Sequence, residues 1–132
     1  MSYLLDTNTC IRYLNGESEK VPRRLASLSS ESVFLCSMVK AELLFGAAKS
    51  RSPDRARAVL QVFFDAFRSL PFDDTAASAY ATIRSGLERE GTPMGPNDLV
   101  IAATALANRA ILVTHNTREF GRVSGLEWED WE

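Results

Sequence analysis

Acidic side chains occur in this sequence at the points where buried strands are predicted to end. The first is Asp6, which directly follows the apolar run Tyr3-Leu4-Leu5. Such a run is typical of a strand covered on both faces, and the carboxyl end of a parallel strand is the usual place for a ligand site in open α/β folds. We therefore predict that Asp6 marks a site to which the rest of the chain brings further carboxylates.

Four more polar side chains are predicted to reach the same edge of the sheet. Glu42 lies about one turn into the helix that follows the predicted strand 33–36, and Asp98 begins a helix that is apolar on nearly every side. Asn116 and Glu119 follow the predicted strand 111–114. In a parallel sheet all these positions point to one edge.

Each acid also has a simpler explanation. Asp6 and Asp98 could be helix N-caps, each worth ~1 kcal/mol. Glu42 could extend into solvent from a half-buried helix, and Glu119 could be a surface residue. A single shared site explains all of these positions at once, whereas the simpler explanations must be invoked separately for each residue.

A group of carboxylates indicates a particular chemistry. Clustered carboxylates repel one another, so they either share protons or bind a cation, and a set of oxygen ligands favours Mg²⁺ or Mn²⁺ over zinc. Such ions lower the pKa of a bound water and stabilise in-line attack on a phosphodiester. Asn8 and Thr114 are candidates to orient a ligand or water, or they cap turns.

Other site chemistries fit the sequence poorly. His115 is the only histidine, so no histidine pair can bind zinc, and we place it in a loop near the site. Cys10 and Cys36 lack metal-ligand spacing and are predicted to pack in the core. The Asp6-Thr7-Asn8-Thr9 stretch has part of the aspartyl-phosphatase pattern, but Asn8 stands where that pattern needs a second Asp. No glycine-rich phosphate loop is present.

The bulk properties suit one α/β domain, residues 1–132. The chain is 45% hydrophobic and 24% charged, and it has no apolar run near the ~20 residues that span a membrane. With no visible secretory signal and two isolated cysteines, we expect a cytoplasmic protein. Residues 1–70 carry 10 Lys+Arg and 7 Asp+Glu, a net charge of +3, whereas residues 71–132 carry 5 and 10, a net charge of −5. A polyanion could therefore dock on a local basic face.

Alternating strands and helices predict a central, mostly parallel sheet flanked by helices. Further strands are expected at 70–72, where Pro71 limits it to an edge, and at 126–131. Thr7 or Asn8, Ser37, Asp73 or Asp74, and Asn97 are predicted helix caps. The clearest helix has its apolar residues at helical spacing: Ala56, Val59, Leu60, Phe63, Phe64 and Phe67.

These motifs together resemble the PIN-domain ribonucleases, and within them the VapC-type toxins of type II toxin–antitoxin systems. The resemblance covers nearly the whole chain. It is carried by the following segments: Leu4-Leu5-Asp6-Thr7-Asn8, Ala41-Glu42-Leu43-Leu44-Phe45-Gly46, Leu70-Pro71-Phe72-Asp73, Gly95-Pro96-Asn97-Asp98-Leu99-Val100-Ile101-Ala102-Ala103 and Leu112-Val113-Thr114-His115-Asn116-Thr117-Arg118-Glu119-Phe120.

The resemblance implies a PIN-like three-layer α/β sandwich and a Mg²⁺- or Mn²⁺-dependent endoribonuclease. By position it makes Asp6 and Asp98 the main metal ligands and Glu42 the third acid, binding directly or through water. The family's fourth acid follows the last core strand. Here Asn116 stands near that place and Glu119 three residues later, so this sequence departs from the pattern and leaves both as candidates.

The same resemblance implies partners. It implies a homodimer, higher assembly with a VapB-type antitoxin that inhibits the toxin, and a structured RNA substrate, with initiator tRNA cut by similar members. We expect the antitoxin to lie along the apolar surface of the N-terminal helices and to place an arginine near Asp6 and Asp98, in competition with the metal. The candidates for RNA phosphate contacts are Arg12, Lys20, Arg23, Arg24, Lys40 and Lys49.

Two other functions compete with this interpretation. A receiver-type signalling module needs a phospho-acceptor Asp at the end of a central strand and a late Lys, but Asp54 lies in a polar break and no Lys follows Lys49. A catalytically weak or inactive PIN-like binding protein is favoured only by Asn116.

Overall fold

A parallel sheet of five strands forms the centre of the structure, a computed structural model that describes residues 1–132. The strands lie in the order β3-β2-β1-β4-β5, and every neighbouring pair is parallel. Their bounds are Arg68–Leu70 (β3), Val33–Cys36 (β2), Tyr3–Leu5 (β1), Ile111–Val113 (β4) and Trp128–Glu129 (β5). The predicted α/β class is confirmed, and the sheet is parallel throughout rather than mostly so.

The first strand occupies the middle of this sheet because both of its faces are apolar. Leu4 and Leu5 are fully buried, and Leu4 is in register with Phe34 on one side and Leu112 on the other. The register aligns the carboxyl ends of β1, β2 and β4. Residues that follow these strands are therefore brought to one edge.

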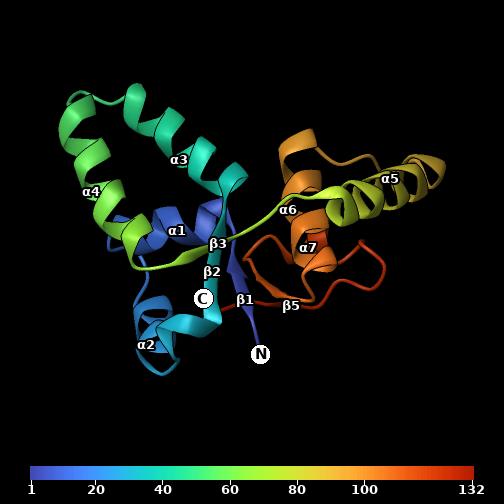
Figure 1. Cartoon of the computed structure of the whole chain (residues 1–132), viewed down its shortest axis with the longest axis horizontal. Coiled ribbons are helices and arrows are strands. Elements are labelled where there is room, and N and C mark those ends of the chain that lie inside the picture. Colours follow the sequence, from blue (N-terminus) through green and yellow to red (C-terminus); the bar gives the residue numbers. More distant parts are fainter.

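Helices connect the strands and flank the sheet (Figure 1). In that view α1, α3 and α4 lie to the left of the central strands, and α5, α6 and α7 lie to the right. Their bounds are Thr7–Leu14 (α1), Lys20–Ala26 (α2), Ser37–Ala48 (α3), Pro53–Asp65 (α4), Asp74–Arg89 (α5), Pro96–Ala107 (α6) and Thr117–Phe120 (α7), with a 3-10 turn at Ser30–Ser32. None of these helices combines the length and the hydrophobicity that a membrane crossing requires.

Helices α6 and α4 differ in how their apolar residues are covered. In α6 the residues Ile101, Ala102 and Ala103 are buried, as their all-round hydrophobicity predicts. In α4 only part of the predicted face enters the core. Phe63 and Phe64 are buried, but Val59, which shares the same helical spacing, is 54% exposed.

Three predicted helix caps differ from the structure. Helix α1 is capped by Asp6, whose Oδ1 accepts from the backbone N–H of Thr9 at 2.8 Å, rather than by Thr7 or Asn8. Ser37 is already the first residue of α3. Helix α6 begins at Pro96, so Asn97 lies inside its first turn and is free to reach another residue. Asp73 caps α5 as predicted.

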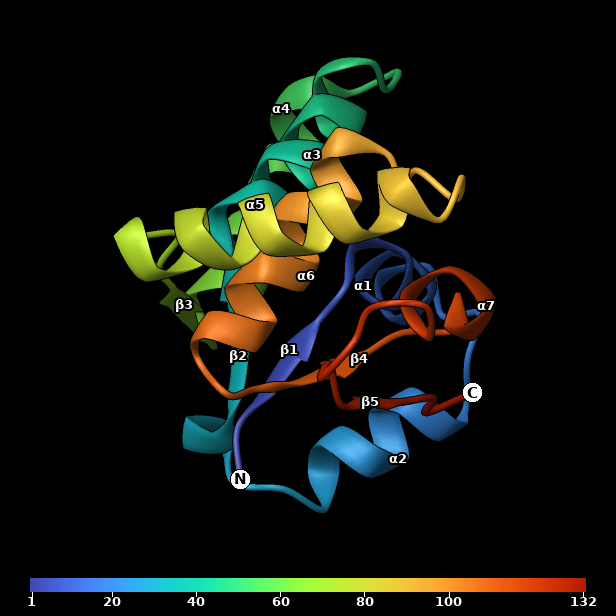
Figure 2. The ribbon, with the colours of Figure 1, turned by 90° about the vertical axis from the view of Figure 1, so that its right-hand side faces the viewer.

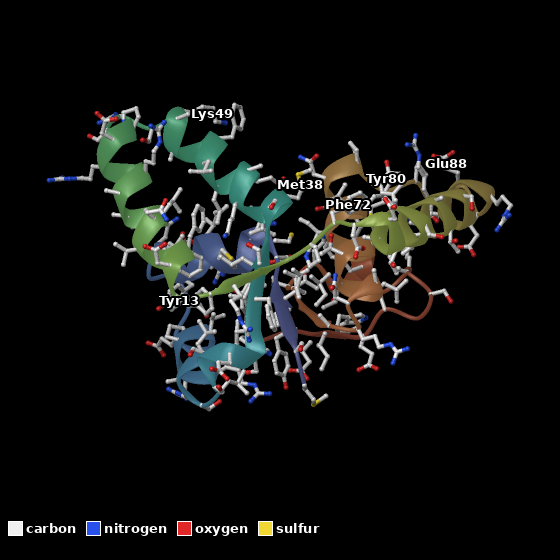
Figure 3. The ribbon with its side chains drawn as sticks, in the orientation of Figure 1. Tyr13, Met38, Lys49, Phe72, Tyr80 and Glu88 are labelled. Carbon is white, nitrogen blue, oxygen red and sulfur yellow. The ribbon has the colours of Figure 1, made fainter.

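Aromatic pairs fix both margins of the sheet. After β3, the rings of Phe72 and Tyr80 meet edge to face, with centroids 6.3 Å apart (Figure 3). At the other margin, β5 is shorter than predicted, and the chain end turns back so that Trp131 packs on Tyr3 with centroids 5.4 Å apart. Figure 2 shows α2 lying beneath β5 near the C-terminus.

Two glycines give a matched test of local packing. A Cβ on Gly121, at the end of α7, would lie 2.6 Å from the backbone oxygen of Thr117, whereas a Cβ on Gly86 inside α5 would meet nothing within 4 Å. We expect Gly121→Ala to destabilise the fold by about 1–2 kcal/mol through overpacking. Gly86→Ala should instead stabilise it by up to about 1 kcal/mol, because alanine favours helix. Urea unfolding of the two variants beside the wild type measures both effects; equal stabilities would contradict the close approach at Gly121.

Candidate metal centre

Asp6 is a buried carboxylate at the end of the central strand. Its side chain is only 4% exposed, and its own backbone N–H donates to the carbonyl of Val113 at 3.1 Å. Burial raises the pKa of Asp6 above its ordinary value, and hydrogen bonds from Thr114 and from Thr9 offset part of this rise. Asp6 is therefore both a helix cap and an acid held in place by hydroxyl and amide donors.

Asp98 lies in the first turn of α6, and three other acids act on it. Burial raises its pKa to about 6, and the negative charges of Glu119, Glu42 and Asp6 add to the effect in that order. Mutual influence of this kind needs the carboxylates to lie near one another. The charges of residues 6, 42 and 119 thus reach Asp98, although the four acids come from four separate segments of the chain.

Glu42 is oriented by two neighbours from other helices. The hydroxyl of Thr7 donates to its Oε1 at 2.5 Å, and the amide of Asn97 donates to its Oε2 at 3.4 Å. Thr7 follows Asp6 in the chain, and Asn97 precedes Asp98. The two bonds therefore tie α3 to the helices that carry the other acids.

Asn116 and Glu119, the two candidates for the place of the family's fourth acid, contact each other. The side-chain amide of Asn116 donates to Oε2 of Glu119 at 2.9 Å, and Arg122 lies 3.9 Å from Oε1 of the same carboxylate. Glu119 is the residue whose charge reaches Asp98, whereas Asn116 is exposed. In this geometry Glu119 carries the charge and Asn116 orients it.

Thr114 links the strand end to the acids. Its side chain is fully buried, it donates a hydrogen bond to Asp6, and its Oγ1 accepts from the backbone N–H of Asn116 at 3.0 Å. The predicted orienting role of Thr114 thus has a direct partner. Asn8, its predicted companion, is exposed in the first turn of α1 and makes no side-chain hydrogen bond.

The donor set fits a divalent cation. It consists of oxygen atoms alone, and the negative charges of Glu119, Glu42 and Asp6 add to the rise that burial causes in the pKa of Asp98. A doubly charged ion bound between them would remove that repulsion. The residues that could hold it are Asp6, Glu42, Asp98 and Glu119.

A second set of possible ligands lies by the chain end. Atoms of His115, Asp130 and Glu132 fall within 4.8 Å of one another, and Nδ1 of His115 is 2.9 Å from Asp130. The Glu132 carboxylate, however, already forms an ion pair with Arg12, and the Glu132 backbone oxygen accepts from Lys20 at 3.4 Å. These contacts anchor the C-terminus to α1 and α2. His115 thus lies in the loop after β4, as predicted, and its ring contacts Asp130.

Several of the predicted phosphate-binding residues are engaged inside the protein. Arg12 pairs with Glu17 and Glu132, and Arg24 pairs with Glu129 at 3.6 Å while stacking on Tyr3 and Trp131. Lys40 lies over the Phe64 ring, and Lys49 lies over the Phe45 ring at the outer end of α3 (Figure 3). Arg23 forms no ion pair. Their contact with RNA stays a prediction.

A largely apolar groove lies along three helices. Its volume is about 640 Å³, and it lies between α1, α3 and α4. Ile11, Leu14 and Val59 line it, and Glu42, Arg51 and Arg55 are also on its wall. Exposed apolar side chains in a groove of this kind are typical of a protein-binding surface.

Sequence reasoning missed three residues that support the acids. Thr7 and Asn97 looked like local caps, and Arg122 carried no signal at all. The sequence offered one clue for the first two, since each adjoins a candidate acid. Their partner, Glu42, is at least 35 positions away in the chain, which no local pattern reveals.

The chain matches known proteins over its full length. The family model of the PIN domain matches residues 3–126. The tRNA(fMet)-specific endonuclease VapC of Salmonella typhimurium is 38% identical over 131 residues, covering 99% of this chain and 98% of that protein. Ribonuclease VapC2 of Rickettsia felis is 34% identical over 133 residues, covering 100% of this chain and 99% of that protein.

Solved structures agree with these matches. DNA-bound VapBC from Salmonella typhimurium superposes with a TM-score of 0.94 at 38% identity, covering 100% of this chain and 99% of the matched chain. VapBC2 from Rickettsia felis, bound to a DNA fragment from its promoter, superposes with a TM-score of 0.91 at 33% identity, and both chains are fully covered.

The raised pKa of Asp98 predicts that the free energy of unfolding of the metal-free protein depends on pH. Because its pKa rises from 3.8 to about 6 on folding, ionised Asp98 opposes folding; this cost is absent below about pH 4 and grows as the pH rises through 6. The shift corresponds to about 3 kcal/mol, which solvent screening of the half-buried side chain and the amino end of α6 reduce to roughly 1 kcal/mol. With EDTA at pH 7.5, Asp98→Asn should therefore unfold at higher urea than the wild type.

The advantage of Asp98→Asn should shrink at pH 5 and vanish when Mg²⁺ is added at pH 7.5. A gain that is the same at both pH values would mean that ionisation of Asp98 is not its cause.

Proposed function

Because this chain belongs to the PIN domain family, and within it to the VapC ribonucleases of VapBC toxin–antitoxin pairs, we propose that it is an endoribonuclease and the toxin of such a pair. The observation that carries the proposal is the effect of Glu119, Glu42 and Asp6 on the pKa of Asp98. Acids close enough to act on one another are what a metal-dependent nuclease needs. Residues 1–132 then form one PIN domain.

In this proposal the acids hold Mg²⁺ or Mn²⁺. Asp6 and Asp98 are the main ligands, Glu42 is the third acid, and Glu119 takes the fourth place. When bound, the ion lowers the pKa of water and neutralises charge that develops on the attacked phosphate. Oxygen ligands and the absence of a second histidine favour these ions over zinc.

The protein's own groups keep the acids in position. Thr114 and Thr9 donate to Asp6, Thr7 and Asn97 donate to Glu42, and the Asn116 amide donates to Glu119. Each donor favours the ionised carboxylate and restricts its rotation. Since the pKa of Asp98 is about 6, this residue is ionised and able to bind cations at neutral pH.

We propose structured RNA as the substrate, with initiator tRNA as the first candidate. Support comes from two similar proteins, of Salmonella typhimurium and Shigella flexneri, that are named tRNA(fMet)-specific endonucleases and are 38% and 40% identical to this chain.

The alternative, a weak or inactive PIN-like binding protein, depended on Asn116 replacing the fourth acid. The contact between Asn116 and Glu119 weakens that argument, because Glu119 restores the missing charge beside Asp98. Mn²⁺ binding by the wild type separates the two functions, since a site without its acids would not bind the ion.

We also propose that a VapB-type antitoxin occupies the groove between α1, α3 and α4. The solved complexes of similar toxins are VapBC pairs, and the groove has the exposed apolar wall that a peptide or helix of a partner can cover. Because Glu42 lines the groove, an antitoxin arginine bound there could reach this acid and compete with the metal. If co-purified antitoxin left Mn²⁺ affinity unchanged, this competition would be wrong.

Two further expectations belong to the same proposal. A homodimer, and a larger assembly with the antitoxin, stay predictions; Phe45 and Val62 are 63% and 75% exposed and offer apolar surface outside the groove. A cytoplasmic location agrees with the two free, buried cysteines, Cys10 and Cys36.

The central test is RNA cleavage with a matched pair of variants. We expect purified wild-type protein to cut RNA into discrete fragments with Mg²⁺ and not with EDTA. Asp98→Asn should lower the cleavage rate at least about 100-fold, since loss of a ligand should cost no less than loss of an outer-shell partner. Asp74→Asn is the control, because Asp74 is also in the first turn of a helix but is not among the charges that act on Asp98. Full activity of Asp98→Asn would exclude the proposed site.

The groove has its own matched test. Val59 lines the groove on α4, and Val62, one turn further on, is more exposed and does not line it. Val59→Glu should weaken antitoxin binding at least about tenfold, because it buries a charge against an apolar partner, and should leave RNA cleavage intact. Val62→Glu should bind antitoxin like the wild type. Calorimetric titration with the antitoxin measures both; equal affinities would place the antitoxin elsewhere.

A further inference from the structure

A polar pocket is lined by Glu119, one of the four candidate acids. It has a volume of about 390 Å³, within the usual range of ligand sites, and its wall is formed by Thr92, Asn116, Arg118, Glu119 and Arg122. None of the five is apolar. Such a pocket suits a charged, hydrated group better than a base or an apolar side chain.

The two arginines of this pocket differ in how they are held. Arg122 is fixed, since its guanidinium donates to the backbone oxygen of Thr92 at 2.9 Å and to that of Glu119 at 3.3 Å. Arg118 is exposed and forms no ion pair. The pocket therefore contains one arginine that is held by hydrogen bonds, Arg122, and one that is free to contact a ligand, Arg118.

The pocket and the acid site share Glu119. One oxygen of this carboxylate faces Arg122 and the other accepts from Asn116, and its charge also raises the pKa of Asp98. A group bound by Arg118 would therefore sit next to whatever the acids hold. A cationic pocket thus adjoins an anionic site. A metal site on its own would have no need of such a neighbouring pocket.

We propose that this pocket binds a phosphate group of the RNA next to the one that is cut, with Arg118 as the main contact and Arg122 as its support. The inference rests on the proposed ribonuclease function and extends it to how the substrate is held. Arginine recognises phosphate oxygens through paired N–H donors, and successive phosphates of one strand are close enough to occupy adjoining sites.

The pocket also assigns a second task to Arg122. By bonding both Thr92 and Glu119, it joins the loop before α6 to the turn after α7. Arg122 is thus a positioning residue for the fourth acid, while Arg118 is the residue that meets the substrate. None of the basic residues expected from the sequence to bind RNA lies in this pocket, because all of them precede residue 50.

The test measures RNA binding without cleavage. Each variant is made in the Asp98→Asn background, and binding of fluorescein-labelled bulk tRNA is followed by anisotropy at several salt concentrations. We expect Arg118→Gln to weaken binding three- to tenfold and to reduce the slope of log K against log salt by about 1, the loss of one phosphate contact. Arg118→Lys should keep most of the slope. Arg57→Gln, on exposed α4, is the control and should change neither quantity.

The outcomes separate this inference from the function on which it rests. If the wild type cuts RNA but Arg118→Gln binds like Arg57→Gln, the pocket is not an RNA contact and the nuclease proposal stands. If neither cleavage nor tRNA binding occurs, both proposals fail. Calorimetry with inorganic phosphate alone identifies the source of the ligand: tight, Arg118-dependent binding that tRNA does not displace would assign the pocket to a free anion and overturn the inference.

Discussion

The repulsion between carboxylates at one edge of the sheet is the constraint on which the rest of this structure depends. Four acids converge there, and burial strengthens their interaction because fewer water molecules screen it. Burial is the main cause of the raised pKa of Asp98, and repulsion by Glu119, Glu42 and Asp6 adds to it. A fold that holds these charges together must offset their repulsion with stabilising interactions elsewhere, chiefly in its apolar core.

The stabilisation that offsets this repulsion comes from a sheet whose central strand is buried on both faces. Leu4 and Leu5 are packed between helices, and α6 is apolar over most of its surface. Apart from Arg122 beside Glu119, neutral donors orient the acids: the threonines at 7, 9 and 114 and the amides at 97 and 116. Because these donors add no positive charge, they leave the site free to attract a metal ion.

The surroundings of the acids divide into two proposed surfaces of opposite character. The groove of α1, α3 and α4 is apolar and reaches Glu42, which suits a protein partner. The pocket by α7 is polar and cationic and reaches Glu119, which suits a polyanion. The acids lie between them, so a partner in the groove and a strand in the pocket would meet at the same place. In this arrangement a partner in the groove would inhibit cleavage by competing with the RNA strand at the acids.

The sequence by itself determined the parts that depend on near neighbours. Apolar runs predicted β1, β2 and β4, strand ends predicted the place of Asp6, and the Gly-Pro-Asn-Asp stretch predicted the start of α6 near Asp98. Only the tertiary structure decided which of Asn116 and Glu119 brings its charge to Asp98, why Asn97 serves Glu42 instead of capping a helix, and why Val59 faces a groove. The reason is physical. Periodicity and capping act within a turn or two of backbone, whereas the meeting of Thr92 with Arg122, or of Thr7 with Glu42, depends on how helices far apart in the chain pack against one sheet.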